Sequence, residues 1–227
     1  MRKQLIVVLT FALTCLGSAL GKAQGESYTP NLAAVADSNA WKLVNAAAEA
    51  VEVDGKHAVR LRAMGDSANR IAGLALPVGG EFTTGVIELD LKGKNVEQGS
   101  FLGVVFSVAN DTTFEGVYFR PFNFKAEEPN RSHSVQYIAW PENTWEKLRK
   151  EQPGRFEKAV VPAPDPDSWF HARIEVGDSQ VRVYVNDAKE PCLVAERLTR
   201  VNTKRPLGLF VDVGEGLYAN LNIAPGK

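Results

Sequence analysis

The sequence predicts an all-β protein, a sandwich or barrel of antiparallel strands. Apolar and polar residues alternate at period two from residue 41 onward, which is the pattern of strands with one buried face. Gly, Asp, Asn or Pro separate these runs, as turns between strands require. Only one segment, residues 143–151, has the pattern of a good helix. Many short strands without a repeated helical pattern exclude the classes in which strands and helices alternate.

Fourteen strands are expected in chain order. They lie near residues 41–46, 50–54, 57–63, 70–76, 83–93, 100–108, 114–120, 133–140, 156–161, 169–177, 180–186, 192–198, 205–213 and 216–223. The single helix over 143–151, NTWEKLRKE, opens on an Asn or Thr cap and ends before Pro153 and Gly154, which are the residues that start and stop helices.

Turn residues support these strand boundaries. Gly177 and Asp178 stand between ARIEV and VRVYV, two clearly alternating runs, and predict a β-hairpin. Gly214 to Gly216 are expected to form a second hairpin in the same way. Residues 163–168, APDPDS, predict an exposed crossing loop, because each proline removes a donor that a central strand needs.

The N-terminal residues have the layout of a secretory signal peptide. Two cations precede an apolar run of about 16 residues, shorter than the ~20 that span a bilayer, and small residues follow up to Ala23. Residues 1–23 are therefore expected to be removed on export to the periplasm or the cell exterior. A lipoprotein using Cys15 is the weaker alternative, because Ala12 and Thr14 fit poorly the residues expected before a lipidated cysteine.

The remaining chain is expected to form a lead-in segment, 24–40, and one domain, 41–227. Without the three basic residues of the signal segment, 23 of the 26 basic residues remain against 27 acidic ones, a formal charge of −4. This balance argues against nucleic acid or anionic lipid as the main partner. Cys192 is then the only cysteine, so no internal disulfide is expected. No second apolar stretch is long enough to span a membrane.

Aromatic residues concentrate in one stretch, 114–156. Nine of the twenty Phe, Tyr and Trp residues lie in these 43 residues, where an even spread would place roughly four. They are mixed with polar side chains that include Arg120, Asn123, His133, Gln136 and Lys147. Rings beside planar polar groups suit a sugar, because its C–H face stacks on a ring while its hydroxyls form directional hydrogen bonds. The stretch therefore indicates carbohydrate, bound or cleaved.

The order of the later segments resembles a known superfamily. These segments are WFHARIEVGDSQVRVYVND, LVAERL and PLGLFVDVGEGLYANLNI, preceded by WKLVNAAAEAVEVDGKHAVRL and FTTGVIELDLKG. Together they resemble the concanavalin A-like lectin/glucanase superfamily over residues 41–225, and within it the 3-keto-disaccharide hydrolase-like, laminin-G or jelly-roll type domains of secreted bacterial proteins. The resemblance implies a jelly-roll sandwich of two bent antiparallel sheets, whose concave face carries sugar sites in many members. Other members bind peptides or proteins, which keeps an envelope protein-interaction module open.

The alternation within 114–120 predicts which side chains face the ligand. Tyr118 and Arg120 share one face with Gly116, which leaves room above the sheet. The opposite face carries Glu115, Val117 and Phe119. Because that set contains the apolar pair, we expect it to face the core, with Tyr118 and Arg120 on the open concave face.

The same reasoning applies to 133–140. Placing Val135 in the core puts Gln136 and Trp140 on the open face and His133 on the inner one, although Tyr137 could reverse the assignment.

Six residues are predicted to bind the ligand. They are Tyr118, Arg120, Asn123, Gln136, Trp140 and Trp145. Arg120 has a rigid fork of donors for a carboxylate or a pair of hydroxyls, and Gln136 both donates and accepts. The two tryptophans are expected to form a rim for stacking, and Asn123 lies in a loop. The alternative is a packed aromatic cluster in which Arg120 pairs with an acid, whose candidates are Glu115, Glu142 and Glu146.

An enzyme is the second hypothesis, acting by hydrolysis or elimination on a modified glycoside. Its candidate proton-transfer groups are His133, Glu115 and Glu142, although an inward-facing His133 favours a structural role. The run GVIELDLKG places Glu88, Asp90 and Lys92 on one strand face and superficially resembles the Glu-x-Asp-x-Glu strand of family-16 glucanases. We do not expect catalysis there, because Lys92 stands where the acid is needed.

Metal and cofactor motifs are not evident in the sequence. The three histidines lack paired ligand spacing, so zinc has no support. A structural calcium ion is left open, because several relatives carry calcium. The loop aspartates Asp111, Asp165 and Asp167 nevertheless show no ordered spacing. No cofactor is expected, and the oligomeric state is left open.

Overall fold

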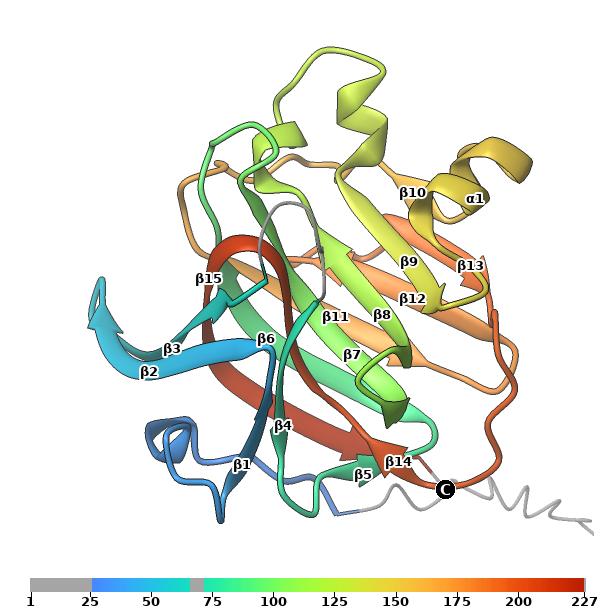
Figure 1. The fold of residues 1–227 in the computed structure, drawn as a ribbon. Helices are drawn as coiled ribbons and strands as arrows, with labels where there is room; N and C mark the ends of the chain where they lie inside the picture. Colours follow the sequence, from blue (N-terminus) through green and yellow to red (C-terminus); the bar gives the residue numbers. More distant parts are fainter. Residues whose placement is uncertain (1–25, 66–71, 227) are drawn as a thin grey trace, which may run out of the picture.

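Two antiparallel sheets packed face to face form the fold in the computed structural model, which describes residues 26–65 and 72–226. Figure 1 shows one of them nearer the viewer, named the front sheet here, and the back sheet behind it. The front sheet contains β1 (Trp41–Val44), β4 (Gly73–Pro77), β7 (Ser100–Asn110), β8 (Thr113–Phe119), β9 (Val135–Trp140) and β10 (Glu157–Lys158). The back sheet contains β2 (Ala46–Val53), β3 (Lys56–Ala63), β6 (Gly85–Lys92), β11 (Phe170–Val176), β12 (Gln180–Val185) and β13 (Leu193–Glu196).

One long strand, β15 (Gly208–Pro225), belongs to both sheets. Its first part pairs with β7 and β4, and its second part pairs with β6 and β3. The strand orders are therefore β10-β9-β8-β7-β15-β4-β1 in front and β13-β12-β11-β6-β15-β3-β2 behind. A separate small ladder joins β5 (Glu81–Phe82) to β14 (Arg205–Pro206).

The predicted hairpin at Gly214 to Gly216 is wrong. The chain does turn there, but its two arms do not pair with each other, because β15 passes from the front sheet to the back sheet at this turn (Figure 1). Gly214 has φ +74°, and a Cβ at this position would lie 2.3 Å from the carbonyl oxygen of Gly99. A glycine was therefore read correctly as a special backbone position, but its role is to let a strand change sheets.

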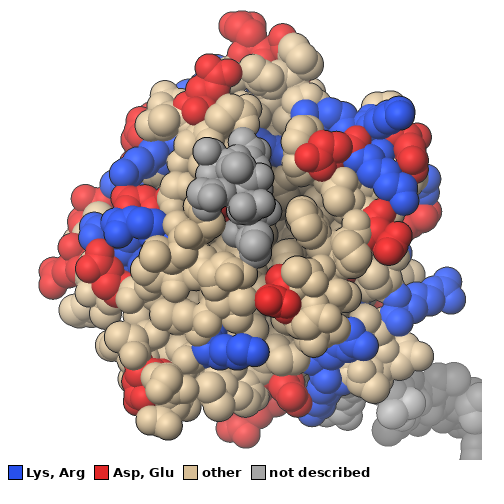
Figure 2. Space-filling model, viewed as in Figure 1, with Lys and Arg blue, Asp and Glu red and all other residues tan. Residues whose placement is uncertain are grey.

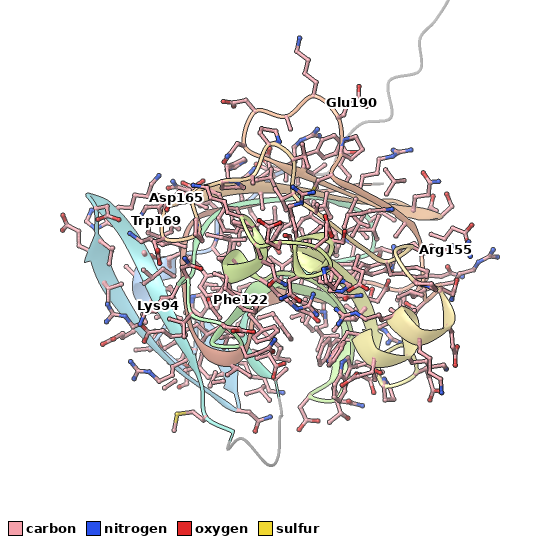
Figure 3. The ribbon with its side chains drawn as sticks, turned by 90° about the horizontal axis from the view of Figure 1, so that it is seen from above. Lys94, Phe122, Arg155, Asp165, Trp169 and Glu190 are labelled. Carbon is pink, nitrogen blue, oxygen red and sulfur yellow. The ribbon has the colours of Figure 1, made fainter. Side chains whose placement is uncertain are left out.

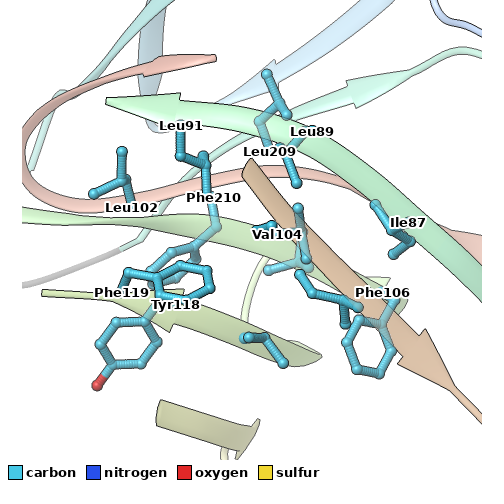
Figure 4. Packing of buried hydrophobic residues seen from close by; sticks show 14 of the residues in the cluster. Ile87, Leu89, Leu91, Leu102, Val104, Phe106, Tyr118, Phe119, Leu209 and Phe210 are labelled. Atoms are coloured by element: carbon cyan, nitrogen blue, oxygen red, sulfur yellow. The ribbon is translucent and has the colours of Figure 1, made fainter. Parts of the chain in front are cut away.

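The core fills the space between the sheets. Phe119 of β8 meets Phe170 of β11, with ring centroids 5.1 Å apart. Figure 4 shows the same layer, in which apolar residues from both sheets pack together, among them Ile87, Leu89, Leu91, Leu102, Val104, Phe106 and Leu209. Full burial of one such side chain contributes about 1.5–3 kcal/mol, so this layer is the main source of stability for the described residues, in which Cys192 is a free thiol.

The predicted helix is present as α1 (Trp145–Glu151). Thr144 caps its start by accepting a hydrogen bond from the backbone N–H of Lys147, and Leu148 is its buried residue. Figure 1 shows α1 beside β9 and β10. Three short 3-10 helices were not predicted: η1 (Leu32–Ala34), η2 (Pro121–Asn123) and η3 (Asn130–His133).

Residues 26–40, part of the predicted lead-in segment, pack against the sandwich. Tyr28 forms a bridge with Ile223 of β15, and Val35 is buried in the core. The predicted signal peptide, residues 1–23, and Cys15 lie outside the described residues. Within the described part of the chain, no helix has both the length and the hydropathy of a membrane span.

β11 and β12 pair antiparallel around residues 177–179, which confirms the expected hairpin. Residues 163–168 form the expected connection outside the named strands, but it is not exposed throughout, because Pro164 and Pro166 are buried.

Candidate functional site

The aromatic and polar stretch places several predicted site residues on one side of the front sheet. Tyr118 of β8 lies directly opposite Gln136 of β9, and Phe114 lies opposite Trp140. These side chains occupy the outer face, which points away from the back sheet. Phe119 faces the back sheet instead. The shared face predicted from alternation is therefore confirmed for these strands, but the predicted openness of that face is wrong, because Tyr118, Arg120 and Gln136 are buried beneath neighbouring side chains.

Arg120, the residue after β8, is a buried cation. It is 4% exposed, and its guanidinium donates to the carbonyl oxygen of His133 at 2.7 Å and to the hydroxyl of Tyr118 at 2.8 Å. Its carbon Cζ lies 4.9 Å from the ring centroid of Tyr118 and 6.0 Å from that of Trp145. Among the described residues, no carboxylate forms an ion pair with it. Both of its hydrogen-bond acceptors are neutral.

Burial sets the electrostatics around this guanidinium. Desolvation lowers the pKa of Arg120, against the opposing effect of nearby negative groups that include Glu157 and Asp212. Burial also raises the pKa of Tyr118 to about 12, with the charge of Arg120 acting in the other direction. Tyr118 is therefore a neutral hydroxyl near pH 7, and it does not supply the negative charge that a buried guanidinium needs.

Gln136 is fully buried beside Tyr118 and only half satisfied. Its amide nitrogen donates to the carbonyl oxygen of Phe156 at 3.2 Å. Its Oε1 has no hydrogen-bond partner. A buried oxygen without a donor costs about 1–3 kcal/mol, so this atom has unused capacity for a hydroxyl or a water molecule.

His133 does not lie where alternation placed it. It belongs to η3, because β9 begins only at Val135, so its ring does not follow the strand pattern and its predicted inward position is wrong. Nδ1 lies 3.0 Å from Oε2 of Glu157, without a hydrogen bond of good geometry between them. Desolvation lowers the pKa of His133, with Glu157 opposing.

Glu157 and Arg149 form a closed ion pair at the edge of this group. Glu157 of β10 accepts three hydrogen bonds from Arg149 of α1, at 2.7 to 3.2 Å. The Cζ of Arg149 lies 4.7 Å from the ring centroid of Trp145. The sequence analysis did not select either residue, although the proximity of α1 to the predicted strand at 156–161 was a usable signal.

The two tryptophans are partly exposed and differ in how their faces are used. Trp140 stacks on Phe114, with centroids 6.4 Å apart and planes 11° from parallel. Trp145 has both Arg149 and Arg120 near its ring. Trp140 is therefore the better platform for a ligand, because one face packs on Phe114 and the residue keeps solvent exposure.

The remaining candidates have other surroundings. Asn123 is buried in η2 and donates to the carbonyl oxygen of His133 at 3.3 Å. Glu142 is exposed, and its carbonyl oxygen accepts from Lys147. Glu115 lies between the sheets, 1% exposed, where Arg197 donates to both of its oxygens at 2.7 and 2.9 Å. Burial and this ion pair hold Glu115 away from any ligand on the outer face.

The rim of the outer face differs from its middle. Figure 2 shows Lys, Arg, Asp and Glu side chains gathered at the upper right, in the region of α1, and mostly uncharged atoms around the grey residues. The view from above in Figure 3 places Arg155 near α1 and Lys94 on the opposite side, with Phe122 between them.

A pocket of about 200 Å³ lies beside β1, β4 and the end of β7 in the front sheet. Val44, Leu74 and Leu76 contribute apolar walls, and Lys42 and Asp111 contribute charged groups.

Asp90 organises a second polar cluster on the outer side of the back sheet. It accepts hydrogen bonds from Lys56 at 2.8 Å and from Asn220 at 2.7 Å, and it lies 2.8 Å from Nδ1 of His171. Lys92 instead pairs with Asp54 at 2.6 Å. The outer strand face of β6 is thus an ion-paired surface network.

The loop aspartates considered for calcium are spread among other partners. Asp165 pairs with Lys125 at 3.0 Å and accepts from the backbone N–H of Asp167. Within residues 26–65 and 72–226, no group of three or more His, Cys, Asp or Glu side chains has the arrangement of a metal site.

Solved structures with the same architecture include lectin-like proteins. A protein of unknown function with a galectin-like fold from Bacillus subtilis has a TM-score of 0.57 at 14% identity, over 90% of this chain and 99% of its own. The carbohydrate-binding module CBM66 from Bacillus subtilis has a TM-score of 0.54 at 13% identity, over 81% and 95%. The exoplasmic/lumenal domain of VIP36, in its Ca²⁺-bound form, has a TM-score of 0.51 at 10% identity, over 82% and 83%.

The chain shares the β-sandwich fold of these structures, one of which is described as galectin-like. Identities this low establish the fold alone and carry over no function. No protein-family model and no curated protein matches the chain. Membership in the 3-keto-disaccharide hydrolase-like family is therefore not shown and stays a prediction.

Proposed function

We propose that this chain is an exported carbohydrate-binding β-sandwich that recognises an oligosaccharide on the outer face of its front sheet. The observation that carries the proposal is the pairing of a partly exposed indole with a buried polar group that is incompletely satisfied. Trp140 offers a ring, and Arg120 and Gln136 offer a guanidinium with neutral partners and an unpaired amide oxygen. Rings and planar polar groups on one face are the two elements of sugar recognition.

The spacing along β9 indicates the length of the ligand. Trp140 and Gln136 are four residues apart on the same strand face, which corresponds to about 13 Å. This span exceeds one sugar ring, so the site suits an oligosaccharide better than a monosaccharide. Similarity of fold to the carbohydrate-binding module CBM66 supports carbohydrate as the ligand class.

A glycan array followed by calorimetry tests the site. Trp140→Ala should weaken binding of the best glycan about tenfold, an effect of the size of one aromatic contact. Trp169→Ala is the matched control, because this partly exposed tryptophan bonds to Asp54 next to the back sheet. Circular dichroism and thermal unfolding of each variant separate lost binding from lost fold. Weakening by Trp169→Ala alone would move the site to the back sheet. Failure of the wild type to bind any glycan would contradict the function and favour a protein-interaction module.

Export is part of the proposal. Expression of the full chain in a bacterial host should give a soluble periplasmic or extracellular product that begins at Gln24, as measured by N-terminal sequencing. A product retaining Met1 would contradict it, and a lipid-modified Cys15 would support the lipoprotein alternative.

An enzyme is a second candidate because of His133. Its imidazole is partly exposed and its pKa is lowered, and Nδ1 lies 3.0 Å from Oε2 of Glu157, so Nε2 is the candidate base. A neutral imidazole of this kind can accept a proton from a bound substrate. Mass spectrometry of oligosaccharides incubated with wild type and His133→Gln distinguishes the two functions. Product formation by wild type and its loss in the variant support catalysis, and unchanged oligosaccharides support binding alone.

A further inference from the structure

We propose that the oligosaccharide contains a uronic acid, a sugar whose carboxylate pairs with Arg120. This inference rests on the proposed function and names the substrate class of that site. It rests on the buried positive charge of Arg120, which has no acidic partner among the described residues. A neutral sugar would leave this charge unpaired, whereas a carboxylate would neutralise it.

Two other arginines of the described chain, one enclosed and one partly exposed, are paired with an acid. The side chain of Arg197, 3% exposed, pairs with both oxygens of Glu115. Arg149 pairs with both oxygens of Glu157. Arg120 is as enclosed as Arg197, but its partners are a carbonyl and a phenol. A buried charge without an opposite charge is costly, and this cost is removed when a counter-charge binds.

The guanidinium geometry of Arg120 suits a carboxylate. A guanidinium carries five N–H groups, and the two hydrogen bonds described use one from each terminal nitrogen. Its planar fork matches the two oxygens of a carboxylate, and such bonds are shorter and stronger than bonds to neutral hydroxyls.

The surroundings favour one carboxylate on a hydroxylated ligand. Glu157 and Asp212 lie near enough for their charges to raise the pKa of Arg120. Closely spaced anionic groups on a ligand would therefore meet repulsion beyond the first. The unpaired Oε1 of Gln136, one strand away from Tyr118, requires a donor such as a hydroxyl. A uronic acid supplies one carboxylate and several hydroxyls on the same ring.

Calorimetry with matched ligands tests the inference directly. The probes are oligosaccharides of galacturonate, glucuronate and mannuronate, each compared with the same oligosaccharide after reduction of its carboxyl groups to alcohols. The linkage and ring are then unchanged. For at least one pair, wild type should bind the acid form about 10- to 100-fold more tightly, the range that hydrogen bonds to charged groups provide. Added salt should weaken only the acid form.

Variants of Arg120 assign the effect to this residue. Arg120→Met should abolish the preference for the acid form, and Arg120→Lys should retain part of it, because lysine keeps the charge without the fork. Arg182→Met is the matched control, since Arg182 is a largely exposed arginine of β12 in the back sheet. It should bind both forms as wild type does. Thermal unfolding shows whether each variant is folded. If Arg120→Met does not fold, Arg120→Lys still tests the inference.

The outcomes separate the inference from the proposed function. Equal binding of acid and reduced forms, with loss of both in Trp140→Ala, would overturn the uronic acid and leave carbohydrate binding intact. Binding of neutral glycans alone would do the same. A preference that persists in Arg120→Met would also overturn the assignment. Binding of no glycan at all would end both proposals.

Discussion

Arg120 and Arg197 are two enclosed guanidinium groups whose pKa values shift in opposite directions. Arg197 lies between the sheets and donates to both oxygens of Glu115, to the carbonyl oxygen of Gly177 and to the hydroxyl of Ser107. Glu115 raises the pKa of Arg197 despite burial. Arg120 has neutral acceptors, and burial lowers its pKa. Burial alone therefore does not identify a functional arginine; the partners of the guanidinium do.

The difference in partners separates Arg197, which stabilises the fold, from Arg120, which is a candidate binding group. The cluster around Glu115 also includes Tyr137, whose hydroxyl donates to the same carboxylate, and Thr199, at 2.5 Å. These bonds connect β8 and β9 to the segment after β13, so they hold the two sheets together. Nothing comparable closes the guanidinium of Arg120 within the described residues.

The largest expected effect tests the structural side of this comparison. Arg197→Met should lower the free energy of unfolding by about 3–5 kcal/mol, because it leaves Glu115 as a buried, unpaired charge. Urea unfolding followed by tryptophan fluorescence measures it. The double variant Arg197→Met/Glu115→Gln should recover part of the loss, since it also removes the charge of the partner. A loss below about 1 kcal/mol for the single variant would contradict the stabilising role of this pair.

A smaller effect on stability is expected at Arg120. Arg120→Met loses two hydrogen bonds from a charged donor, worth about 1.5–3 kcal/mol each, but it also removes a buried charge without an acidic partner. These contributions oppose each other, so the free energy of unfolding should change by about 1 kcal/mol or less. The same urea experiment measures it. If Arg120→Met lowered the free energy of unfolding as much as Arg197→Met does, Arg120 would be a structural residue, and the distinction between the two arginines would be wrong.

The smallest expected effect concerns pH and His133. Its folded pKa is lowered from 6.5, mainly by desolvation, so the unfolded chain takes up the proton first as pH falls. Stability should therefore decrease as pH falls below 6.5 and level off below the folded pKa. Thermal unfolding between pH 7.5 and 5 measures the slope, and His133→Gln should make it shallower. An unchanged slope in the variant would show that other groups cause it.

Much of the fold could be predicted because a strand with one buried face produces an alternating pattern in neighbouring residues of the sequence. Period-two alternation located most of the strands to within a few residues, and it placed Tyr118, Gln136 and Trp140 on the face where they lie. Thr144 and the residues after it predicted α1 for the same reason, since a helix cap is a contact within one turn. These features depend on interactions between neighbours in sequence.

Two features of the candidate region escaped prediction because they are not local. His133 left the strand pattern when residues 130–133 formed η3, and its neighbour Glu157 comes from β10, 24 positions later. The crossing of β15 between sheets depends on which strands lie on either side of Gly214, while its sequence resembles an ordinary turn.

The sequence by itself determined which residues form strands, which faces of those strands are apolar and where the helix begins. Only the tertiary structure decided that Glu115 neutralises Arg197 and leaves Arg120 with neutral partners. Alternation assigns a side chain to a face, but the energy of a buried charge depends on the groups that surround it in three dimensions, and those come from strands that are distant in sequence.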